Sequence, residues 1–213
     1  MKIAILGGTG SLGKGLAVRL AKAGYDVIVG SREREKAEKV AGEYSEKYDV
    51  ELIGMDNAEA SKVCDIAVVT IPWKFAFDTV SNLREELEGK IVVSPIVPME
   101  KTESGFVYIE LPEGSAAERL AKILPESRIV SAYHNIPARR FSDPNAEFEW
   151  DVAVCGDDEE AKGVVMEVTN SIRGLRALDA GSLSNSRIVE SLTPLLINIA
   201  IRNGMRDLGV RFV

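Results

Sequence analysis

Three glycines near the start of the chain have the spacing that binds a dinucleotide. Gly8, Gly10 and Gly13 follow an apolar stretch, residues 3–6, that is typical of a buried strand, and a helical pattern begins directly after them. We expect Gly8 to permit a tight turn, Gly10 to let a pyrophosphate approach the backbone, and Gly13 to let helix and strand pack closely. Free N–H groups and the positive end of the helix dipole would then face the pyrophosphate. The residues expected to contact it are Thr9, Gly10, Ser11 and Leu12.

The residues after the second predicted strand, 26–30, indicate which dinucleotide this is. NAD enzymes carry Asp or Glu about 20 residues past the glycines, to bind the ribose hydroxyls. Here that position holds Ser31 and Arg32, with Arg34 and Lys36 just beyond. A hydroxyl and a guanidinium bind a 2′-phosphate through charge-assisted hydrogen bonds, each worth roughly 1.5–3 kcal/mol. The pattern therefore favours NADP, held by Ser31, Arg32 and Lys36. In the alternative interpretation Ser31 caps the following helix and Arg32 is a solvated charge.

Length and composition limit the class of protein. The 213 residues are 46% hydrophobic and 28% charged, which suits one globular α/β unit with a small extension. A net charge of −7 argues against nucleic acid and anionic membrane as partners. Cys64 and Cys155 lack metal-like spacing, which predicts reduced thiols in a cytoplasmic protein and no metal site. A strand that begins at residue 3 leaves no room for a signal peptide, and the longest apolar stretch, 192–201, is too short to span a bilayer.

Strand and helix patterns alternate along the chain, which predicts a Rossmann-type α/β fold: a doubly wound parallel sheet with helices on both faces. The expected strands are residues 3–6, 26–30, 50–53, 65–71, 90–93 and 128–132, and the expected helices are 12–23, 33–47, 58–63, 73–87 and 116–124. Residues 99–116 are irregular, and we expect a mobile loop there. A polar segment, 142–149, separates a last unit with strands 151–155 and 175–179, a helix 158–172 and a long helix 185–204. This organisation predicts a dinucleotide-binding domain, 1–141, and a smaller C-terminal α/β domain, 142–213.

Ligands of open parallel sheets bind beyond the carboxyl ends of the strands. Residues 70–73, 94–98 and 133–140 should therefore line the nicotinamide and its hydride partner, with Trp73 and Val97 as apolar walls, although Trp73 suits the core equally well. His134 is the only histidine, so a His-rich metal site is excluded. It is a candidate proton relay or a structural residue. Since no acid–base pair of side chains lies near the expected cofactor site, a hydride acceptor that needs no such help is favoured.

Several longer motifs resemble one family over essentially the whole chain. They are residues 7–15 (GGTGSLGKG), 30–32 (GSR), 70–73 (TIPW), 94–98 (SPIVP), 134–138 (HNIPA), 178–187 (LDAGSLSNSR) and 203–205 (NGM). The chain is similar in these to the archaeal reduced-coenzyme-F420:NADP oxidoreductases. Ser11 and Asn135 depart from the family's pattern, and neither change removes a needed donor.

The resemblance implies reversible hydride transfer between C5 of the deazaflavin coenzyme F420 and C4 of the nicotinamide of NADP, with the protein supplying positioning. NADP would be the cofactor and coenzyme F420 the co-substrate. The NADP contacts that the resemblance implies are Thr9, Gly10, Ser11, Leu12, Ser31, Arg32, Lys36, Trp73, Val97, Ala138 and Leu208. Of these, Ala138 and Leu208 rest on the resemblance alone.

The deazaflavin tail, with its phosphodiester and glutamates, would need a basic patch on this acidic protein. Arg139, Arg140 and Arg187 are candidates, and Arg187 follows a polar run at the start of the last helix, where anions bind. Together with His134, Arg187 is the expected deazaflavin contact, and residues 142–213 would help to form that site. The alternative is a capped helix with exposed arginines.

Two other functions stay open on the residues alone. One is an NADP-dependent reductase of a small imine or carbonyl, and the other is a non-catalytic NADP sensor. The C-terminal helix has an apolar face, Leu192, Leu195, Leu196 and Ile199, that suits a dimer interface as well as the core. We expect a homodimer that binds small-molecule coenzymes only.

Overall fold

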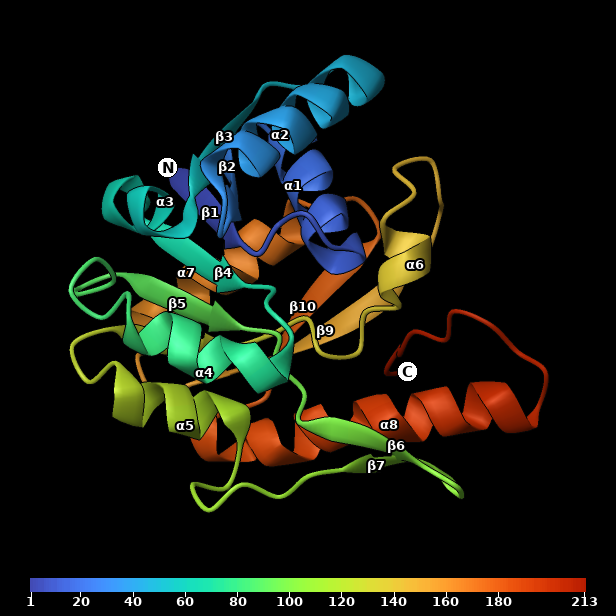
Figure 1. Ribbon diagram of the computed structural model, residues 1–213. Coiled ribbons are helices and arrows are strands. Elements are labelled where there is room, and N and C mark those ends of the chain that lie inside the picture. The colour runs from blue at the N-terminus through green and yellow to red at the C-terminus, as the bar shows by residue number, and fades with distance from the viewer.

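An eight-stranded sheet runs through the centre of the computed structural model, which describes residues 1–213 (Figure 1). Its strands lie in the order β10-β9-β8-β5-β4-β1-β2-β3. They are β1 (Lys2–Leu6), β2 (Asp26–Ser31), β3 (Leu52–Asp56), β4 (Ile66–Val69), β5 (Ile91–Ser94), β8 (Arg128–Ser131), β9 (Trp150–Gly156) and β10 (Leu175–Asp179). The helices are α1 (Ser11–Lys22), α2 (Arg34–Tyr48), α3 (Asn57–Val63), α4 (Trp73–Ser81), α5 (Ala116–Ile123), α6 (Ala138–Phe141), α7 (Glu159–Asn170) and α8 (Ser186–Arg202). The predicted Rossmann-type class and the long final helix are confirmed.

Neighbouring strands pair in parallel from β3 across the sheet to β8, and the next junction, between β8 and β9, is antiparallel. Strand β9 pairs antiparallel to β8, at Val130 with Gly156 and Ser131 with Cys155, and β10 then pairs parallel to β9. The expectation of a parallel sheet is therefore wrong for this one junction, because the chain returns through residues 142–149 without a crossover helix. One continuous sheet thus contains strands from both 1–141 and 142–213.

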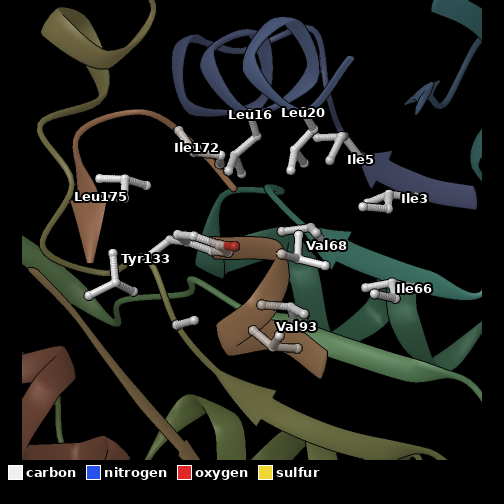
Figure 2. Packing of buried hydrophobic residues seen from close by; sticks show 14 of the residues in the cluster. Ile3, Ile5, Leu16, Leu20, Ile66, Val68, Val93, Tyr133, Ile172 and Leu175 are labelled. Carbon is white, nitrogen blue, oxygen red and sulfur yellow. The ribbon is translucent and has the colours of Figure 1, made fainter. Parts of the chain in front are cut away.

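Helices cover both faces of the sheet. Ile3 and Ile5 of β1 pack on one face with residues of α1, α2 and α7, while the intervening residues of β1 pack on the other with α3, α4 and α5. This alternation follows from the two-residue period of a strand. Figure 2 shows the first cluster, in which Leu16 and Leu20 of α1 lie over the sheet. Strand β1 lies between β4 and β2, so the order of strands reverses at its carboxyl end, where α1 begins.

The segment expected to be a mobile loop forms a hairpin instead. Strands β6 (Met99–Thr102) and β7 (Gly105–Tyr108) pair antiparallel, and the turn between them ends at Gly105, whose φ is +130°. The hairpin lies along α8 (Figure 1). There Asn198 accepts from the N–H of Phe106 at 2.8 Å and donates to its carbonyl at 2.7 Å. Strands of only four residues give too weak a pattern, and the partner is distant in sequence.

Other predicted boundaries are also corrected. Helix α4 ends at Ser81 rather than residue 87, although Leu83 and Leu87 remain buried and so continue the helical spacing of apolar residues. Strand β3 begins at Leu52, two residues later than expected, and a short 3-10 turn, Leu183–Asn185, precedes α8. These differences leave the carboxyl edge of the sheet as predicted.

Candidate functional site

The glycine turn after β1 has the close packing that its motif predicts, with one change in the role of its residues. The positive φ, +72°, lies at Gly7 rather than Gly8, so Gly7 makes the turn. A Cβ on Gly13 would lie 2.6 Å from Cα of Gly8, which explains why helix and strand need glycine at both places. Around Gly10 the space is open, since a Cβ there would meet only the Gly7 carbonyl, at 4.0 Å. This leaves room for a ligand at the start of α1.

Backbone donors are available at the same place. The N–H groups of Thr9, Ser11 and Leu12 have no acceptor within the chain. Helix α1 begins at Ser11, so these are the unpaired N–H groups of its first turn and of the residues before it. Donors at the positive end of a helix dipole are suited to a pyrophosphate. The arrangement fits the dinucleotide that the sequence predicts.

A cavity of about 880 Å³ adjoins the turn and contains the predicted phosphate-binding residues. Its lining includes Thr9, Gly10, Ser31, Arg32 and Lys36, together with Thr70, Ile71 and Pro72 at the end of β4. Arg32 and Lys36 are exposed and form no ion pair, so their positive charges are free for a ligand. The hydroxyl of Ser31 accepts from the N–H of Glu33 at 3.4 Å and keeps its own proton for another partner.

Two of the other charged residues that line this cavity, Arg34 and Asp56, already have partners within the chain. Arg34 is bound by Glu38 at 2.8 Å and by Glu59 at 2.6 Å. Asp56 accepts from the N–H groups of Ala58 and Glu59, both at 2.9 Å, and so caps α3. Asp78 also lines the cavity, so Arg32, Arg34 and Lys36 face it together with the carboxylates of Asp56 and Asp78, and Arg32 and Lys36 are the two cations without an ion pair. A 2′-phosphate has complementary charge.

A second cavity, of about 670 Å³, lies beyond β8 and contains three more of the predicted residues. His134 and Ala138, from the segment after β8, and Leu208, from the end of the chain, line it. Thr193 and Leu196 of α8 form another wall, and the hydroxyl of Thr193 donates to the carbonyl of His134 at 2.8 Å. Sequence reasoning missed Thr193, because only the packing of α8 against the turn after β8 brings it here.

His134 is buried and neutral. Its side chain is 4% exposed, Nδ1 has no hydrogen-bond partner, and Nε2 lies 3.4 Å from the hydroxyl of Ser131. Burial lowers its pKa from 6.5 to about 3, while the backbone of Ser94 opposes this only weakly. The imidazolium is therefore almost absent at neutral pH. The ring can exchange one hydrogen bond with a ligand, but its low pKa argues against a relay that carries a proton as imidazolium.

Five of the predicted residues line neither cavity: Ser11, Leu12, Trp73, Val97 and Arg187. Trp73 begins α4, is half-buried, and donates from Nε1 to the carbonyl of Met99 at 3.0 Å, and Met99 does line the second cavity. Val97 follows β5 and is half-buried. Arg187 is exposed in the first turn of α8, without an ion pair, two turns before Thr193. Sequence reasoning also missed Asn57, whose Oδ1 accepts from the N–H of Gly7 at 3.3 Å.

The rest of the structure gives little indication of a metal site or of a reactive thiol. No group of three or more His, Cys, Asp or Glu side chains is arranged to hold a metal ion. Cys64 and Cys155 are buried free thiols, and burial raises the pKa of each to about 11. None of the helices has the length and apolar character needed to cross a bilayer.

The fold and the glycine turn define an oxidoreductase-type dinucleotide-binding protein. Comparison with known proteins narrows this class. Residues 2–98 match the family described as NADP oxidoreductase, coenzyme F420-dependent. An F420-dependent NADP reductase of Methanocaldococcus jannaschii is 43% identical, over 99% of this chain and 97% of that protein. Another, from Methanothermobacter marburgensis, is 40% identical over the same shares. The chain belongs to the family of F420-dependent NADP reductases.

A solved structure supports the fold independently. A protein of Arthrobacter sp. fb24 has a TM-score of 0.86 to this chain, with 23% identity, and covers 100% of this chain and 99% of its own. At that identity the likeness shows the fold alone. The Rossmann-type arrangement with its C-terminal helix is thus shared along the full length of the chain.

Proposed function

We propose that the chain transfers a hydride reversibly between coenzyme F420 and NADP, with the two rings meeting at the cavity beside His134. The observation that carries this is the succession of two cavities along the carboxyl edge of the sheet. The first contains the glycine turn and the free Arg32 and Lys36, and the second contains His134, Ala138 and Leu208. Sequence identity of 40% and 43% to F420-dependent NADP reductases, over 99% of this chain, favours this function over an imine reductase or a sensor.

The first cavity would hold the adenosine and phosphate end of NADP. The free N–H groups of Thr9, Ser11 and Leu12 would bind the pyrophosphate, and Ser31, Arg32 and Lys36 the 2′-phosphate. Trp73 and Val97 would lie along the path to the nicotinamide, between the carboxyl ends of β4 and β5. Ala138 and Leu208 would contact the ring end from the second cavity.

The deazaflavin would occupy the second cavity, on the side formed by residues 142–213. Hydride transfer between two rings needs alignment and exclusion of water more than acid–base chemistry. The buried, neutral His134 would give one hydrogen bond to the ring that lies there. Arg187 at the start of α8 would bind the anionic tail, since its charge is unpaired and exposed.

The assembly would be a cytoplasmic homodimer built on α8. Ile188, Leu195 and Ile199 are 58%, 53% and 39% exposed and fall on one face of this helix at intervals of seven and four residues. An exposed apolar stripe of this kind favours contact with a second copy. Free buried thiols at Cys64 and Cys155 suit a reducing compartment.

The experiment that tests this function mixes the chain with NADPH and oxidised coenzyme F420 and follows the absorbance of each. Arg32→Ala should raise the KM for NADP about 10- to 100-fold, because one charge-assisted hydrogen bond to the phosphate is lost. Its KM for coenzyme F420 should not change. Arg187→Ala should raise the KM for coenzyme F420 several-fold and leave the KM for NADP unchanged. Each variant therefore serves as the control for the other.

Lys39→Ala, on α2 but outside the lining of the cavity, should change neither KM. Absence of turnover in the unmodified chain would refute the proposed function. Equal affinity for NAD and NADP, unaltered in Arg32→Ala, would refute the assignment of the phosphate site.

A further inference from the structure

The last residues of the chain, 203–213, form a strap without helix or strand. Four of them, Met205, Arg206, Asp207 and Leu208, line the second cavity. In Figure 1 the chain turns at the end of α8 and runs back toward α6 and β9. One wall of this cavity therefore consists of a segment outside regular secondary structure, whose first residues hydrogen-bond back to the end of α8, as Met205 does to Ala200. Whatever holds the strap in place also holds that wall.

A clasp on the first residues of β9 and β10 holds the far end of the strap. Asp151, whose side chain is 3% exposed, accepts from Nε and Nη2 of Arg176 at 2.8 and 2.7 Å. The same carboxylate accepts from the N–H of Phe212 at 2.6 Å, and Arg176 donates to the carbonyl of Phe212 at 2.7 Å. The N–H of Asp151 donates to the carbonyl of Val210 at 2.7 Å. The buried carboxylate of Asp151 thus binds both the guanidinium of Arg176 and the N–H of Phe212, and each of these contacts holds the strap.

The strap is also fixed on both sides of Leu208. Before it, Asp207 has a φ of +56° and lies 3.9 Å from Arg139 of α6. After it, Gly209 lies against the indole of Trp150, where a side chain would have no room. From Leu208 to Phe212 an extended chain covers only about 13 Å. Leu208 thus lies within a short, nearly taut stretch of the clasp, and opening the clasp at Phe212 removes one of the anchors that keep Leu208 in the cavity wall.

We propose that Asp151 and Arg176 are positioning residues for hydride transfer, which fasten residues 203–213 so that Leu208 forms part of the coenzyme site. Neither residue lines the cavity, and both act through the strap. This inference rests on the proposed function, since it takes the occupant of the cavity to be the coenzyme. An open strap is a binding-incompetent state, so the apparent affinity falls in proportion to the fraction of molecules in which the strap is docked.

The first test is Asp151→Asn in the full-length chain. Loss of the paired carboxylate should raise the KM for NADP about 5- to 30-fold, while kcat changes less than about twofold, because saturating coenzyme restores the docked strap. Arg176→Gln should give the same result and serves if Asp151→Asn fails to fold. Arg173→Ala is the matched control, since its ion pair with Glu147 lies nearby with side chains 92% and 86% exposed and touches no strap residue. An unchanged KM, or a fall in kcat alone, would overturn the proposal.

The second test separates positioning from a general loss of stability. A chain that ends at Leu208 should show the same rise in KM, and adding Asp151→Asn to it should add less than about twofold, because the two changes act through one contact. Independent, additive effects would overturn the proposal. Dissociation constants for NADPH, measured by fluorescence, should follow the same pattern. This binding measurement also tests the strap if the unmodified chain shows no turnover with coenzyme F420, a result that would count against the proposed function alone.

Discussion

Glu190 joins three elements around the second cavity, and its titration should make the folded protein less stable as pH rises. The side chain is fully buried on α8, three residues before Thr193. Oε2 accepts from the hydroxyl of Tyr108 at 2.7 Å and from the N–H of Ala116 at 3.0 Å, and Oε1 accepts from the N–H of Ala117 at 3.2 Å. One carboxyl therefore fastens the hairpin and the start of α5 to α8. Burial raises its pKa from 4.5 to about 7, although these hydrogen bonds work in the opposite direction.

The sign of the effect follows from proton binding. Between pH 4.5 and about 7 the folded chain holds the Glu190 proton more tightly than the unfolded chain, so stability falls as pH rises through this range. At about 1.36 kcal/mol for each pKa unit, the full loss is about 3 kcal/mol. His134 has the opposite sign: its pKa is lowered from 6.5 to about 3, so it adds stability as pH rises toward 6.5. The two slopes partly cancel between pH 4.5 and 6.5 in the unmodified chain.

Glu190→Gln isolates the carboxyl, because His134 is common to both proteins. We expect the free energy of unfolding of the variant, relative to the unmodified chain, to rise by about 2.5 kcal/mol between pH 5 and pH 8. The assay is urea unfolding followed by circular dichroism at four pH values in that range. Glu110→Gln, which removes an exposed carboxyl near the hairpin, should leave the pH dependence unchanged. Parallel curves for Glu190→Gln and the unmodified chain would refute the reasoning.

The remaining predictions concern His134 and the outer face of α8. His134→Asn should lower kcat without changing the shape of its pH profile between pH 6 and 9, since a group with a pKa of about 3 is protonated in only about one molecule in 1,000 at pH 6. An inflection near pH 6.5 that disappears in the variant would contradict this. Leu195→Asp, at a position 53% exposed, should convert the proposed homodimer to a monomer in light scattering, whereas Arg202→Ala should not. The proposed interface would be contradicted if the unmodified chain were already monomeric at micromolar concentration.

Sequence reasoning was successful where the signal is local. The glycine spacing and the absence of an acid after β2 depend on residues adjacent in the chain, and the structure gathers Thr9, Gly10, Ser31, Arg32 and Lys36 around one cavity. The buried strands were predictable for the same reason, because continuous apolar runs such as Ile66–Val69 are typical of parallel strands covered on both faces. In both cases neighbouring residues carry the whole pattern.

What the sequence could not reveal depends on contacts between distant residues. The hairpin needs Asn198, ninety-two residues beyond Phe106, to pair with its backbone. Thr193 reaches the second cavity only because α8 packs against the turn after β8, and its distance from His134 in sequence is 59 residues. The antiparallel placement of β9 is likewise a property of the loop 142–149 and its neighbours rather than of any strand pattern. Such long-range choices leave little trace in composition or periodicity.

The charges around the two cavities explain how an acidic protein accommodates anionic coenzymes. Near the first cavity Glu38 and Glu59 share the guanidinium of Arg34, and Asp56 caps α3, so Arg32 and Lys36 keep their charges free of ion pairs in a lining that also contains Asp78. In the second cavity the imidazole is neutral, and α8 contributes apolar side chains such as Leu196. Two cations without ion pairs thus face the first cavity, whereas the second combines a neutral imidazole and apolar side chains of α8 with the charged Arg139, Arg206 and Asp207. Because a hydride transfer between rings requires close approach rather than a charged catalyst, phosphate binding in the first cavity would place binding energy away from the reaction and leave the proposed reacting end to alignment.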